Sequence, residues 1–590
     1  MRITYNDKLN KLLNPYLESL LKEKSSLEPE TLTLFDLFME DLDMGGRYGI
    51  FSEILEPRLE EIIREENIES IANLMDGRLN TLFRYMLGDE FAGLFHTYLQ
   101  LEARCPHTIG YDRRAQRSAN PSNHLDHARD AWLQFLKLRA TGFSVEAILK
   151  GGNTPEDTEE FSGYMNSSYW LAAQIAQGNE KVIEYLNQVL TSENNVHRLQ
   201  RWYLHAIAIS GYHPLLELEG KLLLAAKLQE GLRQAIVETM DEGCPESYLY
   251  LFSIIYNNGL QRFASVKRSI AVCTGIGEQD SSERITNKYV ELIWNFLNHQ
   301  ETARNALQSK DTVELYLALW SIGFYDTDEI RAIVPDIIRK GAKHQIQTLL
   351  YFLRCTQSSQ MNHLISKDAF EVWHDDPKVV AAILPLYMDG LYLSRYSDNK
   401  EAPTLSDYFE SPEEAVRHYG YLKQVYQSIS AKEIYSPYVF PWDCVVLTRS
   451  DVVHKMAYIA WMTNDIRLRE ELCTYLPALE SYSRASYIGI VLAHTESKVE
   501  QEYVLQSLGD RSADIRDEAY KVLSEMSLSP EQYQNIEELL RFKYSEMRIN
   551  AINLLMKQPE AQLAASIRRL LSNKNAERRL AGLDMMKSIR

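Results

Sequence analysis

Glycine and proline, the residues that most often end helices and strands, are scarce in this sequence. The chain has 590 residues but only 26 glycines and 18 prolines, whereas the two together make up roughly 12% of an average protein. Few breakers favour long helices joined by short turns. Strand-like alternation is also rare: the best candidate is Tyr438–Leu447, and its Pro441 restricts it to an edge or a loop. Both shortages predict an all-α protein.

Long apolar runs and paired cysteines are missing as well. No run approaches the roughly 18 apolar residues that a membrane-spanning helix needs, and the opening MRITYNDKLN has no apolar signal core. The six cysteines form no Cys-x-x-Cys pair, and this scatter fits reduced thiols in a reducing compartment. We therefore predict a cytoplasmic protein that does not bind membranes.

The motifs of common enzyme classes are absent from the sequence. It has no Walker-type lysine loop, no Gly-x-Ser-x-Gly elbow and no His-Glu-x-x-His helix. Gly275 and Gly277 lack a third glycine and a preceding strand, so they fit a helix end better than a phosphate-binding loop. We predict no catalytic residue and no cofactor, and expect the chain not to be an enzyme.

Positive charge is in short supply except at one end. The formal net charge is −19, which disfavours a protein that binds nucleic acid over its whole surface. Between Arg541 and Arg590, however, eleven Lys and Arg stand against four Asp and Glu. The basic side chains gather at Arg568, Arg569, Lys574, Arg578 and Arg579. Such a cluster indicates either a solvated helix face or a docking site for an acidic surface.

What the sequence does have is a repeat. Residues 512–526 carry one apolar helical stripe, made of Ile515, Ala519, Val522, Leu523 and Met526. Asp514 is placed to cap this helix, and the small Ala519 lets a neighbouring helix approach closely.

An arginine marks four of the repeats, and in three of them alanine follows it three residues later. Successive marked arginines stand 32, 32 and 30 residues apart, and Ala457 extends the series upstream. These repeat-frame residues are Arg484, Arg516, Ala519, Arg548, Ala551, Arg578 and Ala581. A fixed period of helix pairs is typical of a stacked solenoid, in which each pair buries its apolar face against the next.

At these residues the sequence resembles the HEAT-like repeat superfamily, over about residues 451–590. The resemblance implies an α-solenoid, often with a ladder of turn aspartates and helix arginines between units. The arginines are present here, whereas the aspartate is clear only at Asp514. Folds of this kind serve many tasks and often present long surfaces to other proteins.

A looser resemblance covers residues 201–278, from RWYLHAIAIS to GIGE. This stretch is similar to the helical N-terminal regions of large uncharacterised bacterial proteins grouped as MolR-like. The resemblance implies a helical leader that precedes C-terminal domains of unknown function. Because the last marked helix also has no partner helix or polar cap after it, we expect the chain to be part of a longer protein.

Composition divides the chain into an N-terminal helical region, a middle helical region and a HEAT-like array, at residues 1–150, 151–400 and 401–590. The Gly, Pro and acid-rich segment 150–163 and the linker 395–415 are the clearest breaks. The linker ends in Ser411-Pro412, a capping residue followed by proline at the first helical position, so a helix should begin there.

Four residues are candidates for a metal site: Cys105, His107, His124 and His127. Cysteine and histidine suit zinc, and His124 and His127 can share a helix face. Their spacing matches no common zinc motif, and a surface loop with a helix start at Asn120-Pro121-Ser122 explains the same residues. We therefore predict no metal.

The predicted function is a non-enzymatic helical-repeat scaffold for a protein partner or for a further domain of its own protein. Two alternatives stay open: nucleic-acid binding through the basic helices, and a metal-dependent enzyme or structural metal site at the cysteine and histidines. The predicted partner-binding residues are Arg568, Arg569, Lys574, Arg578 and Arg579.

Overall fold

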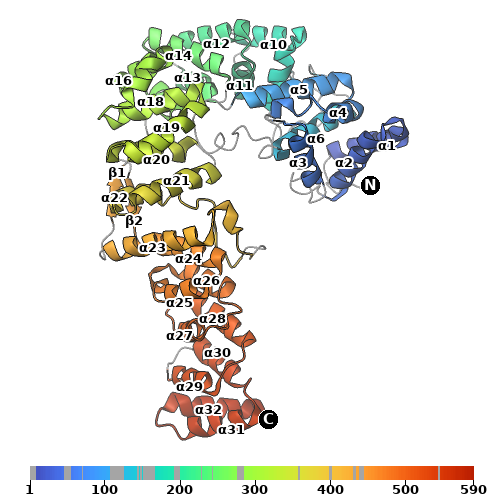
Figure 1. Cartoon of the computed structure of the whole chain (residues 1–590). Coiled ribbons are helices and arrows are strands. Elements are labelled where there is room, and N and C mark those ends of the chain that lie inside the picture. Colours follow the sequence, from blue (N-terminus) through green and yellow to red (C-terminus); the bar gives the residue numbers. More distant parts are fainter. Residues whose placement is uncertain are drawn as a thin grey trace. The chain divides into compact units, whose positions relative to one another are not determined.

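The computed structural model describes most of the chain, at residues 8–44, 55–68, 71–105, 125–141, 145, 149, 167–191, 199–226, 229–241, 243–275, 285–356, 359–396, 401–429, 434–437, 444–541 and 545–589. These residues divide into two compact units (Figure 1). Unit 1 holds the described residues up to Ile337 and Tyr351–Ser358, and unit 2 holds Ile338–Leu350 and the described residues from Ser359 onward. The boundary falls inside the predicted middle region, and the three-region division stays a prediction.

Unit 1 is built from helices. They are α1 (Lys8–Glu23), α2 (Pro29–Met44), α3 (Leu55–Glu65), α4 (Leu79–Leu87), α5 (Asp89–Arg104), α6 (Leu125–Thr141), α9 (Ser167–Ala176), α10 (Glu180–Thr191), α11 (Arg201–Ser210), α12 (His213–Ala225), α13 (Glu230–Glu238), α14 (Pro245–Asn257), α15 (Ala264–Cys273), α16 (Asn287–Asn298), α17 (Gln300–Ala306) and α18 (Thr312–Tyr325). Two further helices contribute to both units, α19 (Thr327–Lys340) and α20 (Lys343–Thr356).

Unit 2 continues with helices and one small sheet. Its elements are α21 (Ser359–Trp373), α22 (Pro377–Ile383), α23 (Pro412–Ser428), β1 (Ile434–Pro437), β2 (Cys444–Leu447), α24 (Arg449–Thr463), α25 (Ile466–Leu472), α26 (Ser481–Ile490), α27 (Lys498–Ser507), α28 (Ala513–Glu525), α29 (Pro530–Leu539), α30 (Ser545–Leu555), α31 (Glu560–Leu571) and α32 (Ala576–Ile589). Short 3₁₀ turns lie at Lys24–Ser26, Ile71–Asn73, Thr239–Asp241, Leu260–Arg262, Leu405–Asp407 and Leu476–Ala478.

The prediction of an all-α class is confirmed. Among the described residues the only strands are β1 and β2, which pair antiparallel from Ile434–Leu447 to Pro437–Cys444. The strand expected within 438–447 is therefore present at its end, in an isolated two-stranded sheet. None of the described helices combines the length and the apolar content that crossing a bilayer requires.

Local sequence signals explain where several helices begin and which ones are buried. At the end of the predicted linker, the Ser411 hydroxyl accepts a hydrogen bond from the Glu414 amide, with Pro412 at the first helical position, so the predicted start of α23 is confirmed. Helix α18 is apolar around its whole circumference, and eleven of its fourteen residues are buried. The expectation that Asp514 caps α28 is wrong: the cap is Ser512, and Asp514 lies within the first turn.

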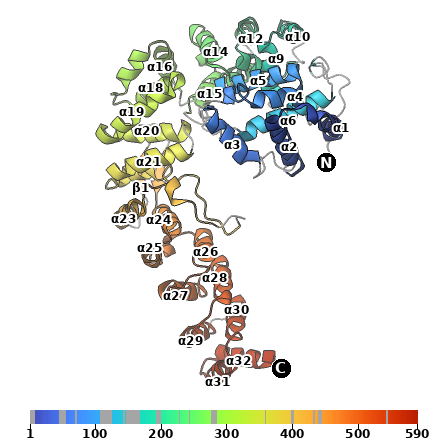
Figure 2. The same cartoon turned by 45° about the vertical axis from the view of Figure 1, so that its right-hand side comes forward.

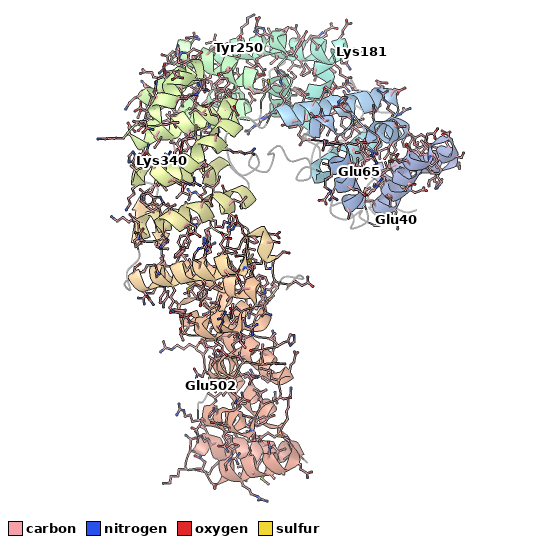
Figure 3. All side chains as sticks on the ribbon, viewed as in Figure 1. Glu40, Glu65, Lys181, Tyr250, Lys340 and Glu502 are labelled. Atoms are coloured by element: carbon pink, nitrogen blue, oxygen red, sulfur yellow. The ribbon has the colours of Figure 1, made fainter. Side chains whose placement is uncertain are left out.

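From α25 onward, alternate helices of unit 2 contact each other in two series. Helix α26 contacts α28, which contacts α30, which contacts α32; likewise α25, α27, α29 and α31 follow one another. Figure 2 shows these ribbons in succession, orange to red, and Figure 3 shows the side chains between them, with Glu502 labelled on α27. The small frame residues Ala519, Ala551 and Ala581 are all buried, as expected where helices approach closely.

The frame arginines of α26 and α30 reach carboxylates of the next pair. A nitrogen of Arg484 lies 2.8 Å from Oδ2 of Asp510, and one of Arg548 lies 2.8 Å from Oδ2 of Asp584. Arg516 instead donates to the backbone carbonyls of Asp510 and Arg511, each at 3.0 Å. Arg484 and Arg548 therefore join successive helix pairs, whereas the Arg516 hydrogen bonds hold the turn that precedes its own helix.

The second series is joined by two-pronged ion pairs. Arg469 on α25 donates through Nε and Nη2 to both oxygens of Glu500 on α27, each at 2.8 Å. Arg569 on α31 holds Glu537 on α29 in the same way, at 2.6 and 3.2 Å. This fork geometry is the strongest form of an arginine–carboxylate contact.

Candidate partner-binding surface

The structure places the five predicted partner-binding residues on one helical hairpin, α31–α32. Arg568 and Arg569 lie in the last turn of α31, where the helix dipole favours cations. Lys574 lies in the connection, and Arg578 and Arg579 lie in the first turns of α32. The sequence therefore located a local cluster of cations correctly, while their role in binding stays a prediction.

Two of these five residues have carboxylate partners among the described residues. Arg569 is held by Glu537, and this hydrogen bond raises the pKa of its guanidinium. Arg578 forms an ion pair with Glu538 of α29, and its side chain is only 13% exposed. These two arginines join α29 to α31 and α32 rather than offering free charge.

Four other cations lie at the same end of unit 2 without a carboxylate partner. Within the described part of the chain, no ion pair forms at Arg568, Lys574, Arg579 or Lys587, and all four side chains are exposed. Arg579 donates only to the carbonyls of Asn573 and Lys574, at 2.9 and 2.8 Å. Their charge is therefore available to a ligand.

An open groove of about 540 Å³ has one of these four cations, Lys574, in its lining. Glu537 and Glu538 line it from α29, and Arg569, Lys574 and Arg578 line it from the α31–α32 hairpin. Because the two carboxylates are paired with the two arginines, Lys574 is the cation in the groove with no acidic partner among the described residues. The groove suits a segment that brings its own carboxylate.

Helix α32 also exposes apolar side chains that the sequence analysis did not single out. Leu580, Leu583 and Met586 are 49%, 48% and 45% exposed. We call these three residues, with Arg579 and Lys587, the α32 face. The sequence pattern that could have revealed them is a second apolar stripe, on the side of the helix away from Ala581 and Met585.

Of the four candidate metal ligands, Cys105 is the one whose side chain is among the described residues. Cys105 is buried in unit 1, and its Sγ lies 3.6 Å from the carbonyl of Ile209. His107 and His124 lie outside the described residues, and His127 belongs to α6, where its side chain is not described. The metal alternative stays an untested prediction.

A buried polar network in unit 2 was missed by sequence reasoning. His418 on α23 is fully buried, with Nε2 at 3.0 Å from Glu371 of α21 and Nδ1 at 2.8 Å from the Tyr387 hydroxyl. Burial lowers the pKa of His418, although the Glu371 carboxylate opposes that shift. These partners are 31 and 47 residues from His418 in sequence, so no local pattern marks them.

The same network offers donor atoms that a metal ion uses, but it does not fit one. One ligand atom from each of Glu371, Glu414 and His418 lies within 4.8 Å of the others. Arg417 donates to Glu371 at 2.7 and 3.1 Å, and the Lys367 ammonium lies 3.0 Å from Glu414. A dication would meet these two cations at close range, so the cluster fits an internal ion-pair network.

A group of tyrosines forms a second surface of unit 2. Tyr392 and Tyr396 are largely exposed, and the Tyr482 hydroxyl lies 3.2 Å from that of Tyr392. The Arg395 guanidinium lies over the rings of Tyr396 and Tyr482, 4.9 and 5.8 Å from their centroids, and pairs with Asp514 of α28. The start of the predicted linker is thus anchored on the helices rather than free.

Comparison with known protein families gives a match over most of the chain. Residues 34–590 match the model of a protein family described as a family of unknown function, DUF5724. No curated protein and no solved structure matches the chain. The surfaces of the chain itself therefore have to carry any proposal about its role.

Proposed function

The chain belongs to the DUF5724 family, whose function is unknown. We propose a role for the chain that is based on the surfaces described above. It is a non-enzymatic scaffold in which α25–α32 form an α-solenoid of HEAT-like helix pairs. The two series of helix contacts and the arginine–carboxylate pairs between successive pairs support this architecture. Its task is to hold a protein partner without covalent chemistry.

The observation that carries the proposal is a set of four exposed cations that have no carboxylate partner among the described residues, one of which, Lys574, lines the groove. Arg568, Lys574, Arg579 and Lys587 lie at one end of a chain whose formal net charge is −19. Exposed charge of one sign steers an oppositely charged partner and fixes its orientation. An acidic protein segment is the partner that this surface favours.

A nucleic acid is the weaker alternative for the same surface. Glu538, which lines the groove, is 59% exposed and would face a phosphate backbone. The sequence also has no aromatic residue after Tyr544 on which a base could stack. The proposal is therefore a protein partner, and nuclease treatment separates the two cases.

We expect Arg568→Glu/Lys574→Glu/Lys587→Glu to reduce recovery of the partner about tenfold or more, because charge reversal turns attraction into repulsion. The measurement is quantitative affinity purification from nuclease-treated and untreated cell extract. Lys378→Glu/Lys498→Glu/Arg511→Glu, which reverses three other exposed cations of unit 2, is the matched control with the same change in net charge. Equal recovery by both variants, or loss of all recovered material on nuclease treatment, would contradict the proposal.

A further inference from the structure

The apolar part of the α32 face is held outward by the packing of the opposite side of the helix. Ala581, Gly582 and Met585 are buried, and a methyl group added at Gly582 would lie 3.1 Å from Cβ of Leu570. This close approach to α31 fixes the rotation of α32 about its axis. Leu580, Leu583 and Met586 therefore face solvent because the helix cannot turn them inward.

The leucines of this face are specific to α32 and are not a feature of every repeat. Thirty residues earlier, α30 has Asn550 and Asn553 at the positions of Leu580 and Leu583. In α28, a further 32 residues earlier, the equivalent positions hold Glu518 and Lys521. At the positions where α32 has exposed leucines, α28 and α30 therefore carry polar side chains.

Cations border the apolar stripe on the same side of the helix. Arg579, Leu583 and Lys587 are spaced four residues apart, so they lie one above another on the helix surface. Lys574 precedes the helix, and none of these cations has a carboxylate partner among the described residues. The surface is complementary to a ligand that combines apolar side chains with flanking carboxylates.

We propose that the α32 face docks an amphipathic acidic helix of a partner protein, an inference that rests on the proposed scaffold function. Three apolar side chains in line along one helix match the i, i+3, i+4 ridge of a second helix. The partner's carboxylates then pair with Arg579, Lys587 and Lys574. An extended acidic segment would satisfy the cations but would leave the leucines uncovered. An anionic membrane is disfavoured because Asp584, whose side chain is 40% exposed, lies four residues after Leu580 and so next to it on the helix surface.

The test is fluorescence anisotropy with the full chain and a labelled synthetic peptide of about 18 residues, five helical turns. The peptide carries leucine at i, i+3, i+4 and i+7 with glutamates beside them, and a scrambled peptide of identical composition is the first control. We expect Leu580→Ser/Leu583→Ser to weaken binding about tenfold or more, and the scrambled peptide to bind correspondingly weakly. The bound peptide should also gain the circular dichroism signal of a helix. Ile466→Ser/Val499→Ser, which changes two similarly exposed apolar residues, should leave the affinity unchanged.

The outcomes separate this inference from the proposed function. One outcome is that both peptides bind equally and only the Arg568/Lys574/Lys587 charge reversal weakens their binding. In that case the surface binds acidic segments without recognising a helix, so the inference fails and the proposed function stands. If neither peptide binds, the inference is overturned. If vesicles of phosphatidylserine and phosphatidylcholine retain the chain through Leu580 and Leu583 while the peptides do not bind, the face is a membrane site and the inference is likewise overturned.

Discussion

Replacing Glu500 with alanine is expected to lower the free energy of unfolding of unit 2 by about 3–5 kcal/mol. The Glu500 side chain is fully buried, and Arg469, which it binds with both oxygens, is 13% exposed. The Thr495 hydroxyl also donates to Glu500. Removing the carboxylate leaves a largely buried guanidinium without its counter-ion, and this desolvated charge accounts for most of the loss. Urea unfolding, with hydrogen exchange in α25–α29 to locate the effect, measures it.

Two further variants show whether the ion pair itself is responsible. Glu502→Ala, two residues along the same helix (Figure 3), removes a carboxylate that, among the described residues, accepts one side-chain hydrogen bond, from Gln506. It should change stability by less than about 0.5 kcal/mol. Arg469→Met/Glu500→Leu replaces both partners by apolar side chains and should recover most of the stability. A double variant as unstable as Glu500→Ala would show that the loss comes from packing around position 500 and not from the unpaired charge.

The second large effect is a loss of stability in mild acid caused by His363. Burial, aided by the nearby cations Lys367 and Lys455, lowers the pKa of His363 from 6.5 to about 4, against the opposing hydrogen bond to the Tyr408 carbonyl. Nδ1 of His363 accepts a hydrogen bond from the Met388 amide at 2.8 Å, so a proton on Nδ1 would break that bond. The native state therefore resists protonation.

Because the pKa of His363 is lower in the folded chain than in the unfolded chain, acid favours the unfolded state. Above pH 6.5 the histidine is neutral in both the folded and the unfolded chain, and its contribution is fully present. As pH falls from 6.5 to about 4, the unfolded chain binds the proton and the folded chain does not. The free energy of unfolding therefore falls by about 3 kcal/mol in total over this range. Met388 has a φ of 53°, an unfavourable value for a residue with a side chain, and its amide depends on this bond.

His363→Gln should remove most of this pH dependence, since an amide does not titrate. The measurement is urea unfolding of unit 2 at intervals from pH 7 to pH 5, a window above the range in which most carboxylates titrate. His494→Gln, which changes an exposed histidine, should keep the wild-type slope. An unchanged slope in His363→Gln would assign the acid sensitivity to His418 and His454, whose pKa values are also lowered by burial.

The features predicted correctly from the sequence are those with a local signature. The helical class follows from the scarcity of glycine, proline and strand-like alternation, and the start of α23 follows from Ser411-Pro412. The frame alanines are buried because small side chains at a fixed period mark close helix contacts. Each of these signals lies within a few turns of one helix, where spacing alone carries the information.

The features that were missed depend on contacts between distant segments. Glu371, Tyr387 and His418 meet only because α21, α23 and the segment after α22 pack together. Arg395 lies in a stretch that reads as a linker, and its anchoring requires Asp514, 119 residues away. The sequence also did not show which cations of the basic cluster lack a carboxylate partner, because this depends on Glu537 and Glu538 of another helix. Burial and ion pairing at such sites follow from tertiary structure rather than from composition.

The alternating helix contacts of α25–α32 have a mechanical consequence. Each internal helix of a series touches the helix before it and the one after it, so tension applied at α32 passes through the contacts of α32 with α30 and α31 and the Arg578–Glu538 pair to the helices before them. Because the pairs are linked in series, each carries the same tension and the weakest set of contacts yields first. A ligand that pulls on this end would therefore extend the chain in steps, one helix pair at a time, and the ion pairs between successive helices would set the force at which each step occurs.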